Sequence, residues 1–252
     1  MMANELIIAN TIDEALKLKD ADSAFLAGGT EVNRKDSPVQ AARLILIDRI
    51  PGLNQIEPDQ SGLWLKLGAN VTFQQALDHA LVPCWMKEAL RFMGSLQKRE
   101  RAAVCGNIAA GRSDSYLLPA LIASGARLEL KSAGGEQILP VSDLMLNPDG
   151  YRESLITSVL IPTEGIKVLN KRYANTVESH AYLTLSMSRS ADRYRIGMAI
   201  KGSGVYNCDV TNWSVIWNKA EVRDDMYGTE SYKRYLTGTT LDDMYEKLEA
   251  ES

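Results

Sequence analysis

The sequence predicts an α+β fold, in which a two-lobed domain over residues 1–163 precedes a small C-terminal domain over residues 164–252. In the first 50 residues, short apolar runs alternate with glycine turns and helix starts, which indicates a small lobe over about residues 1–55. Further strands and helices predict a second lobe over residues 56–163. Beyond residue 165, longer apolar runs predict an antiparallel sheet accompanied by helices.

The composition is that of an ordinary globular protein. Of 252 residues, 45% are hydrophobic and 24% are charged, and the net charge of −4 provides no basic surface for nucleic acid. No apolar run approaches the roughly 20 residues of a membrane span, and no signal peptide is expected. The three cysteines, Cys84, Cys105 and Cys208, match neither a disulfide framework nor a metal-site spacing. We therefore expect a reduced, cytoplasmic protein that binds no nucleic acid and spans no membrane.

The first lobe is predicted to contain a capped helix and two buried strands. Thr11 caps the helix, and Glu14 three residues later completes the pattern of a capping box. The apolar run Ala24–Ala27 stops at Gly28-Gly29, as a buried strand does when it enters a turn. A second strand is expected over Arg43–Asp48.

The same patterns predict the remaining elements. The second lobe is expected to contain a strand over Leu63–Gly68, a helix capped by Thr72, a helix over Trp85–Leu96, a buried helix over Leu117–Ala123 that ends at Gly125, a hairpin of Arg127–Lys131 with Ile138–Pro140, and a strand over Leu155–Pro162. The C-terminal domain is expected to contain strands over Ala181–Met187, Tyr194–Ile200 and Thr211–Trp217 and a helix over Leu236–Leu248.

Two glycine-containing motifs carry the functional prediction. The first motif is Leu26–Glu31, which contains Gly28-Gly29, and the second motif is Ala103–Asn107, which contains Cys105-Gly106-Asn107. Glycine reaches positive φ and has no Cβ to hold a ligand at a distance. Because a phosphate binds to several convergent backbone N–H groups, two such turns predict a site for the pyrophosphate of a dinucleotide. Taken alone, Gly28-Gly29 also fits an ordinary turn.

Four passages in order resemble one family. They are Phe25–Glu31, Gly94–Ala109, Ser113-Asp114 with Pro119–Ala126, and Pro140–Leu144 with Glu153–Pro162. Together they resemble the flavin-binding subunit of the molybdenum hydroxylases, the family of xanthine and carbon monoxide dehydrogenases. The resemblance implies a two-lobed FAD-binding domain of the PCMH, or vanillyl-alcohol-oxidase, type over about residues 5–165.

The resemblance also implies the residues that bind FAD. They are Leu26, Ala27, Gly28, Gly29, Thr30 and Glu31 in the first motif, Ala103, Val104, Cys105, Gly106 and Asn107 in the second, and Asp114, Ile156 and Lys171 elsewhere. Arg172 is an alternative to Lys171 as the cation near the flavin, and Asp114 is alternatively a helix cap. The family's second motif usually has threonine and glycine where this chain has Ala103 and Cys105, so weaker FAD binding is expected.

The implied activity is electron transfer without a catalytic acid or base. FAD would receive electrons from the [2Fe–2S] clusters of a small partner subunit and pass them to NAD or another acceptor. A molybdopterin-containing large subunit would bind the substrate. Two alternatives stay open: a free-standing FAD-dependent oxidoreductase, and a flavin-free scaffold whose site has decayed. No metal is expected on this chain.

Overall fold

The structure is a computed structural model that describes residues 5–35, 37, 39–163, 165–176, 179–190, 193–210 and 220–250. Contacts within the chain divide it into two compact units. The first unit comprises residues 1–81, 94–110 and 127–161, and the second comprises residues 82–93, 111–126 and 162–252. Each unit is therefore assembled from segments that are distant in the sequence.

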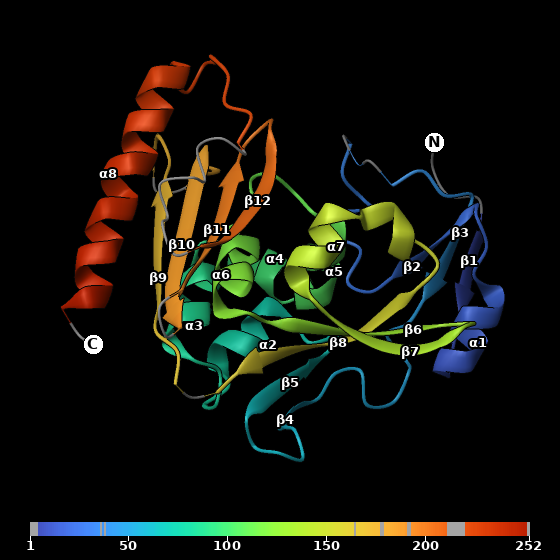
Figure 1. The fold of residues 1–252 in the computed structure, drawn as a ribbon. Helices are drawn as coiled ribbons and strands as arrows, with labels where there is room; N and C mark the ends of the chain where they lie inside the picture. The colour runs from blue at the N-terminus through green and yellow to red at the C-terminus, as the bar shows by residue number, and fades with distance from the viewer. Residues whose placement is uncertain are drawn as a thin grey trace. The chain divides into compact units, whose positions relative to one another are not determined.

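A parallel sheet opens the first unit (Figure 1). Its strands are β1 (Glu5–Ile8), β2 (Ser23–Leu26) and β3 (Arg43–Leu46), and helix α1 (Ile12–Leu18) joins β1 to β2. β3 lies between the other two and is parallel to both, so all three strands end at the same edge. The predicted cap is confirmed, because the Thr11 hydroxyl accepts from the amide of Glu14 at 3.1 Å.

The first unit also contains a five-stranded sheet in the order β4-β5-β8-β6-β7. Its strands are β4 (Ile56–Pro58), β5 (Trp64–Gly68), β6 (Arg127–Ser132), β7 (Gly135–Pro140) and β8 (Leu155–Pro162). The predicted hairpin is confirmed, since β6 and β7 are antiparallel. The central strand β8 is buried along all but its last residue, as its apolar sequence predicts.

Short helices complete the first unit. They are α2 (Phe73–Asp78), α4 (Leu96–Arg99), α5 (Val104–Ala110), α7 (Val141–Leu146) and the 3₁₀ helix η1 (Pro148–Tyr151). Thr72 and Gln75 form a capping box at the start of α2, which confirms the predicted cap. The helix predicted over Trp85–Leu96 is wrong in its last turn, because it ends at Arg91 and Gly94 then takes a φ of +95°.

The second unit is built on an antiparallel sheet in the order β12-β11-β10-β9. Its strands are β9 (Val168–Tyr173), β10 (Leu183–Ser190), β11 (Arg193–Ile200) and β12 (Gly204–Val210). The strands predicted around β10 and β11 are confirmed. The strand predicted over Thr211–Trp217 lies outside the described residues.

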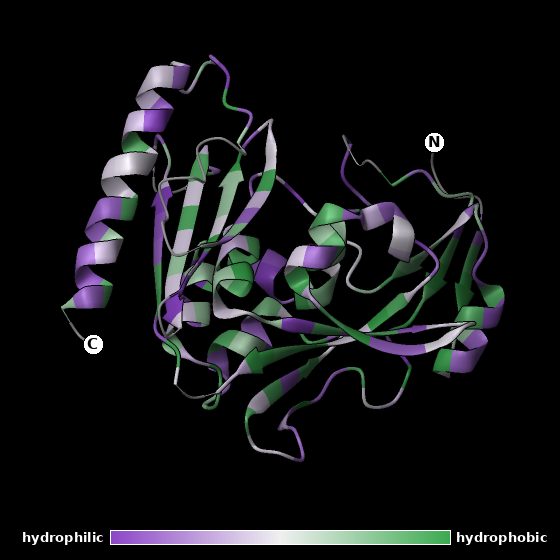
Figure 2. Ribbon diagram, viewed as in Figure 1, coloured by the Kyte–Doolittle hydropathy of each residue, from purple (hydrophilic) through white to green (hydrophobic). Residues whose placement is uncertain are grey.

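Helix α8 (Glu230–Glu249) lies along one face of this sheet (Figure 1). Apolar side chains that alternate along the central strands pack against it, among them Leu185 on β10 and Met198 on β11. Leu241 and Met244 of α8 belong to the same buried cluster. Much of α8 is coloured purple or white in Figure 2, which marks hydrophilic and intermediate residues, and its leucine and methionine residues belong to the buried cluster or pack against it.

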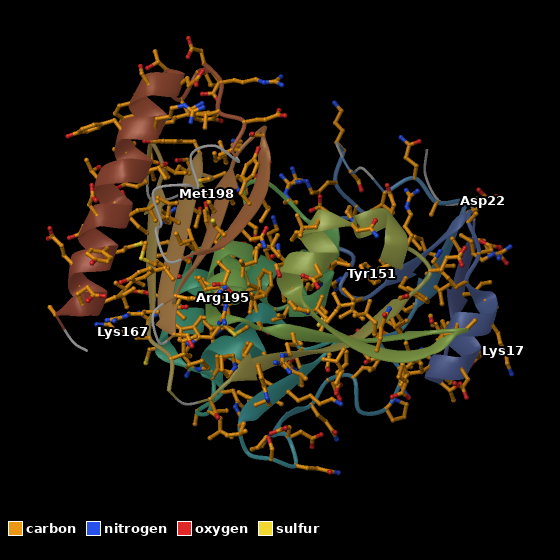
Figure 3. The ribbon with its side chains drawn as sticks, viewed as in Figure 1. Lys17, Asp22, Tyr151, Lys167, Arg195 and Met198 are labelled. Carbon is orange, nitrogen blue, oxygen red and sulfur yellow. The ribbon has the colours of Figure 1, made fainter. Side chains whose placement is uncertain are left out.

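Helices α3 (Cys84–Arg91) and α6 (Leu117–Ser124) belong to the other face. Here the strands carry small residues, and Ser188 of β10 donates to the carbonyl of Ala123. Arg195 and Met198 (both labelled in Figure 3) are three residues apart on β11 and therefore face opposite sides of the sheet. Arg195 lies beside Gly125, the left-handed residue that ends α6. Small side chains thus let the buried helix α6 approach the sheet closely.

Gly197→Ala should destabilise the second unit because α6 leaves no room at this position. A Cβ on Gly197 would lie 2.2 Å from the carbonyl oxygen of Pro119. We expect a loss of about 2 kcal/mol in the free energy of unfolding, the usual scale for overpacking a core. Urea denaturation followed by circular dichroism measures it, and a loss below about 0.5 kcal/mol would show that α6 moves away freely.

Candidate functional site

Backbone contacts hold the first motif at the end of β2. Ile47, which follows β3, donates its N–H to the carbonyl of Leu26 at 3.0 Å. Gly29 has a φ of +70°, which glycine adopts without steric cost. A Cβ on Gly28 would lie 1.6 Å from the carbonyl oxygen of Arg101. No side chain fits there, so glycine lets the first motif pack directly on the chain that leads to the second.

The second motif is not a glycine turn, and that prediction is wrong. It lies in helix α5, where the amide of Asn107 donates to the carbonyl of Ala103 at 3.0 Å. Glycine in a helical turn needs no positive φ, and Gly106 has none. The amides of Cys105 and Gly106 occur early in the helix, where amides have no partner within it. The motif therefore presents backbone donors by helix geometry rather than by a turn.

Both departures from the family pattern face the interior. Ala103 is 5% exposed and Cys105 is 3% exposed, and burial raises the pKa of the Cys105 thiol to about 12. Gly106, by contrast, is exposed, and a Cβ there would meet only the Cβ of Ala103 at 3.7 Å. The side chain of Cys105 is therefore buried and does not cover the exposed side of α5. Weaker FAD binding than in relatives stays a prediction.

The two motifs lie together in the first unit. Gly28 packs on Arg101, and the amide of Val104 donates to the carbonyl of Val71 at 2.9 Å, which fixes the start of α5. The first turn of α5 carries no acidic residue. Glycine backbone at the first motif and the amides in the first turn of α5 at the second form the type of surface to which a pyrophosphate binds. The residues present therefore fit a dinucleotide.

Glu31, the acidic residue of the first motif, has a cationic partner close by in the sequence. The amide of Asn33 donates to the carbonyl of Gly29 at 3.1 Å, which makes one helical turn after the glycines. Glu31 forms an ion pair with Arg34 at 3.9 Å within this turn. A phosphate that approaches Gly29 and Thr30 would therefore meet an acid that already has a cationic partner.

Ile156, the third predicted contact region, belongs to the core of the five-stranded sheet. It lies on β8 opposite Leu130 of β6 and is 9% exposed. Its apolar character is thus explained by packing in this sheet, and its predicted contact with the flavin stays a prediction.

Asp114 belongs to the second unit, where it is the centre of a charged cluster. Its side chain is 7% exposed and accepts hydrogen bonds from Nε and Nη2 of Arg112 at 2.8 and 3.0 Å. Nδ1 of His180 lies 3.5 Å from Asp114 Oδ2. The alternative of a helix cap falls to Ser115, whose hydroxyl accepts from two amides of α6 at 3.2 Å each.

Lys171 and Arg172 project from opposite faces of β9. Lys171 is exposed and helps to line a cavity of about 430 Å³ between β9 and α8. The guanidinium of Arg172 lies over the ring of Phe92 at 3.9 Å and that of Tyr116 at 5.4 Å. Because neighbouring strand residues alternate in direction, only one of these two cations can face a given ligand.

Asn70 is a residue of this region that the sequence did not single out. It follows β5, and its side-chain Nδ2 donates to the carbonyl of Ile47 at 2.7 Å. Its own amide donates to the carbonyl of Leu53 at 2.6 Å. Both partners are backbone carbonyls distant in the sequence, so no local pattern indicates the contact.

Across the described ranges, no three His, Cys, Asp or Glu side chains gather as they would around a metal ion. None of the described helices combines the length and the apolar character that a bilayer crossing requires.

Residues 2–164 match the family described as the FAD binding domain in molybdopterin dehydrogenase, over well more than half of the chain. The chain belongs to this family. The resemblance found in the sequence is thereby confirmed, and FAD is the cofactor. The chain thus carries the FAD-binding domain of the molybdopterin dehydrogenases, a family of oxidoreductases.

Two relatives of this FAD-binding chain match along most of its length. The uncharacterized protein YgfM of Escherichia coli (strain K12) is 25% identical over 97% of this chain and 96% of its own. The glyceraldehyde dehydrogenase medium chain of Sulfolobus acidocaldarius is 24% identical over 71% of this chain and 67% of its own.

Solved structures share the fold. A chain of carbon monoxide dehydrogenase from Hydrogenophaga pseudoflava has a TM-score of 0.76, with 19% identity over 94% of both chains. A chain of quinoline 2-oxidoreductase from Pseudomonas putida 86 has a TM-score of 0.78, with 17% identity over 93% of this chain and 92% of its own. At these identities the likeness concerns the fold, and it confirms the predicted α+β class.

Asp114→Asn should lower stability at neutral pH and lose that effect in acid. Burial raises the pKa of Asp114, but hydrogen bonds and charge from Arg112, with the charges of His180 and Lys201, outweigh burial and hold the pKa below its ordinary value. A carboxylate of this kind stabilises the fold above its unfolded pKa and ceases to do so as the pH falls through its folded pKa.

Urea denaturation at a series of pH values checks this. At pH 7, the free energy of unfolding of the unaltered protein should be about 2 kcal/mol higher than that of Asp114→Asn. The difference should persist to about pH 5 and shrink below about pH 4. A difference that grows in acid would contradict the assigned role of the Arg112 contact.

Proposed function

We propose that the chain transfers electrons through FAD within a molybdenum hydroxylase complex, and that the two motifs bind the pyrophosphate of FAD. One observation carries the proposal: Gly28 packs on the carbonyl of Arg101, which brings the first motif to the chain that enters the second. A pyrophosphate placed there can accept hydrogen bonds from both motifs at once.

Each motif has a separate part in this binding. In the first motif, Leu26 ends the strand, and Ala27, Gly28, Gly29 and Thr30 supply backbone close to the phosphates. In the second motif, Val104 anchors the helix through its bond to Val71, and the amides of Cys105 and Gly106 donate to the phosphates. The side chain of Asn107, half-buried beside Gly106, is proposed to contact FAD, whereas Ala103 contributes only backbone.

Three further residues complete the proposal on the strength of the family resemblance. They are Asp114, Ile156 and Lys171. Asp114 is held ionised by Arg112, so it can accept a hydrogen bond from a hydroxyl or amide of the cofactor. Lys171 has an exposed ammonium group, which would favour negative charge on a reduced flavin.

The redox chemistry is supplied by FAD when it is bound, and the protein positions it and excludes water. Electrons would come from [2Fe–2S] clusters of a small subunit and leave to NAD or another acceptor. A molybdopterin-containing large subunit would carry the substrate site. The matched family is a domain of molybdopterin dehydrogenases, and one relative is named as the medium chain of its enzyme; both support this division of labour.

Gly106→Ala should weaken FAD binding without weakening the fold. Alanine is favoured over glycine in a helix by about 0.8–1.0 kcal/mol, and the added Cβ meets only an ordinary contact of 3.7 Å. The same Cβ would occupy the exposed side of α5, where a phosphate must approach the amides. We expect a dissociation constant for FAD about tenfold higher, equivalent to 1.4 kcal/mol, measured by flavin fluorescence, and an unchanged or higher melting temperature.

Gly134→Ala is the matched control, since Gly134 is an exposed glycine of the β6–β7 turn with an ordinary contact at 3.6 Å. It should leave FAD affinity unchanged. Unaltered affinity in Gly106→Ala would remove the second motif from the site. An unaltered protein that shows no flavin absorption after incubation with FAD and desalting would sink the proposed function itself.

A further inference from the structure

Asn70 joins the two lobes of the first unit through one side chain. Its Nδ2 donates to the carbonyl of Ile47, at the end of β3 in the first lobe, at 2.7 Å. Asn70 itself belongs to the second lobe, between β5 and α2. Its amide donates to the carbonyl of Leu53, in the connection between the lobes, at 2.6 Å. The side chain and the backbone amide of Asn70 thus bind two carbonyls, those of Ile47 and Leu53, in the segment where the chain leaves the first lobe.

Both ends of this link lead directly to the motifs. On one side, Ile47 donates its N–H to the carbonyl of Leu26, the first residue of the first motif. On the other side, Val71 follows Asn70 and accepts from the amide of Val104, where α5 begins. The path from one motif to the other therefore runs through three hydrogen bonds, joined by the backbone of Ile47 and by the peptide bond between Asn70 and Val71.

The surroundings of Asn70 make the link rigid. A Cβ on Gly68 would lie 2.4 Å from the carbonyl oxygen of Leu53, so the connection rests directly on the backbone of β5. The amide of Gly68 donates to the carbonyl of Gln55 at 3.0 Å. The charged residues of the connection, Asp48 and Arg49, are both exposed. A small shift at Asn70 would consequently be passed to Ile47 and not absorbed by a loose loop.

The other half of the Asn70 amide is costly to the fold. Among the described residues, its Oδ1 is buried and accepts no hydrogen bond. A buried polar atom without a partner loses the free energy of its hydration. An amide is therefore a poor choice for stability alone at this position, whereas a donor is required to bond the carbonyl of Ile47.

We infer that Asn70 is a positioning residue for FAD: it sets the spacing between the two motifs through its bond to Ile47. The inference rests on the proposed function, since it concerns the same pyrophosphate site. Asn70 touches the cofactor nowhere in this scheme. It acts through Ile47 on the first motif and through Val71 on the second.

Asn70→Asp tests whether FAD affinity depends on the hydrogen bond that Asn70 donates to the Ile47 carbonyl. The aspartate side chain has the same shape as asparagine, but it can donate to the Ile47 carbonyl only when it is protonated. Burial raises the pKa of a carboxyl group, so the protonated form is populated as the pH falls. We expect the dissociation constant for FAD to rise about tenfold at pH 8 and to return to within about threefold of the unaltered protein at pH 5. Asn54→Asp, which adds the same charge at an exposed site of the connection, is the control and should change the affinity at neither pH.

Asn70→Leu provides a second variant that carries no charge and donates at no pH. It should bind FAD more weakly at both pH values while remaining folded, because it also removes the unpaired Oδ1. Full affinity in Asn70→Leu, or an equal loss in Asn70→Asp at pH 8 and pH 5, would overturn the inference.

Hydrogen exchange on the FAD-free proteins separates this inference from the proposed function. In Asn70→Asp at pH 8, the hydrogen-bonded amides at the two ends of the link, those of Ile47 and Val104, should exchange about tenfold faster than in Asn54→Asp, and unchanged rates would contradict the positioning role. If the unaltered protein binds no FAD while these rates differ, the proposed function fails and the link between the motifs stands.

Discussion

The first unit depends on a place where two backbones touch with no side chain between them. Gly28 lies against the carbonyl of Arg101 so closely that a Cβ would fall at 1.6 Å. Such an approach is available only to glycine, and it brings a strand end of the parallel sheet to the entrance of α5. The pyrophosphate site proposed for FAD depends on that contact, because two sets of amides must converge before they can share one pyrophosphate.

The departures in the second motif illustrate how burial changes the meaning of a substitution. From the sequence, Cys105 adds a side chain where the family usually has none. In the folded chain that side chain points inward and its thiol stays protonated. The exposed position is taken by Gly106 instead. The motif can therefore change its sequence at an inner position while its outer surface keeps the same bare backbone.

The sequence predicts most of the short-range features of the fold, whereas its long-range contacts leave no local pattern. The caps at Thr11 and Thr72 and the left-handed Gly125 after α6 each involve residues within a few positions of one another, so the pattern alone predicts them. Gly106 is an exception among the local features, because a glycine early in a helix has the same sequence pattern as a glycine in a turn. Asn70 was missed because its partners lie 17 and 23 positions away.

The division of the chain has a consequence for how it acquires its structure. It passes from one unit to the other near residues 81, 93, 110, 126 and 161, so neither unit is a continuous stretch. During synthesis, the second unit begins at residue 82, before the first unit is complete at residue 161. No single proteolytic cut separates the two units. Assembly must close long loops before either core is filled, which slows folding. The two units are therefore expected to form in one cooperative event and to resist exchange as independent modules during evolution.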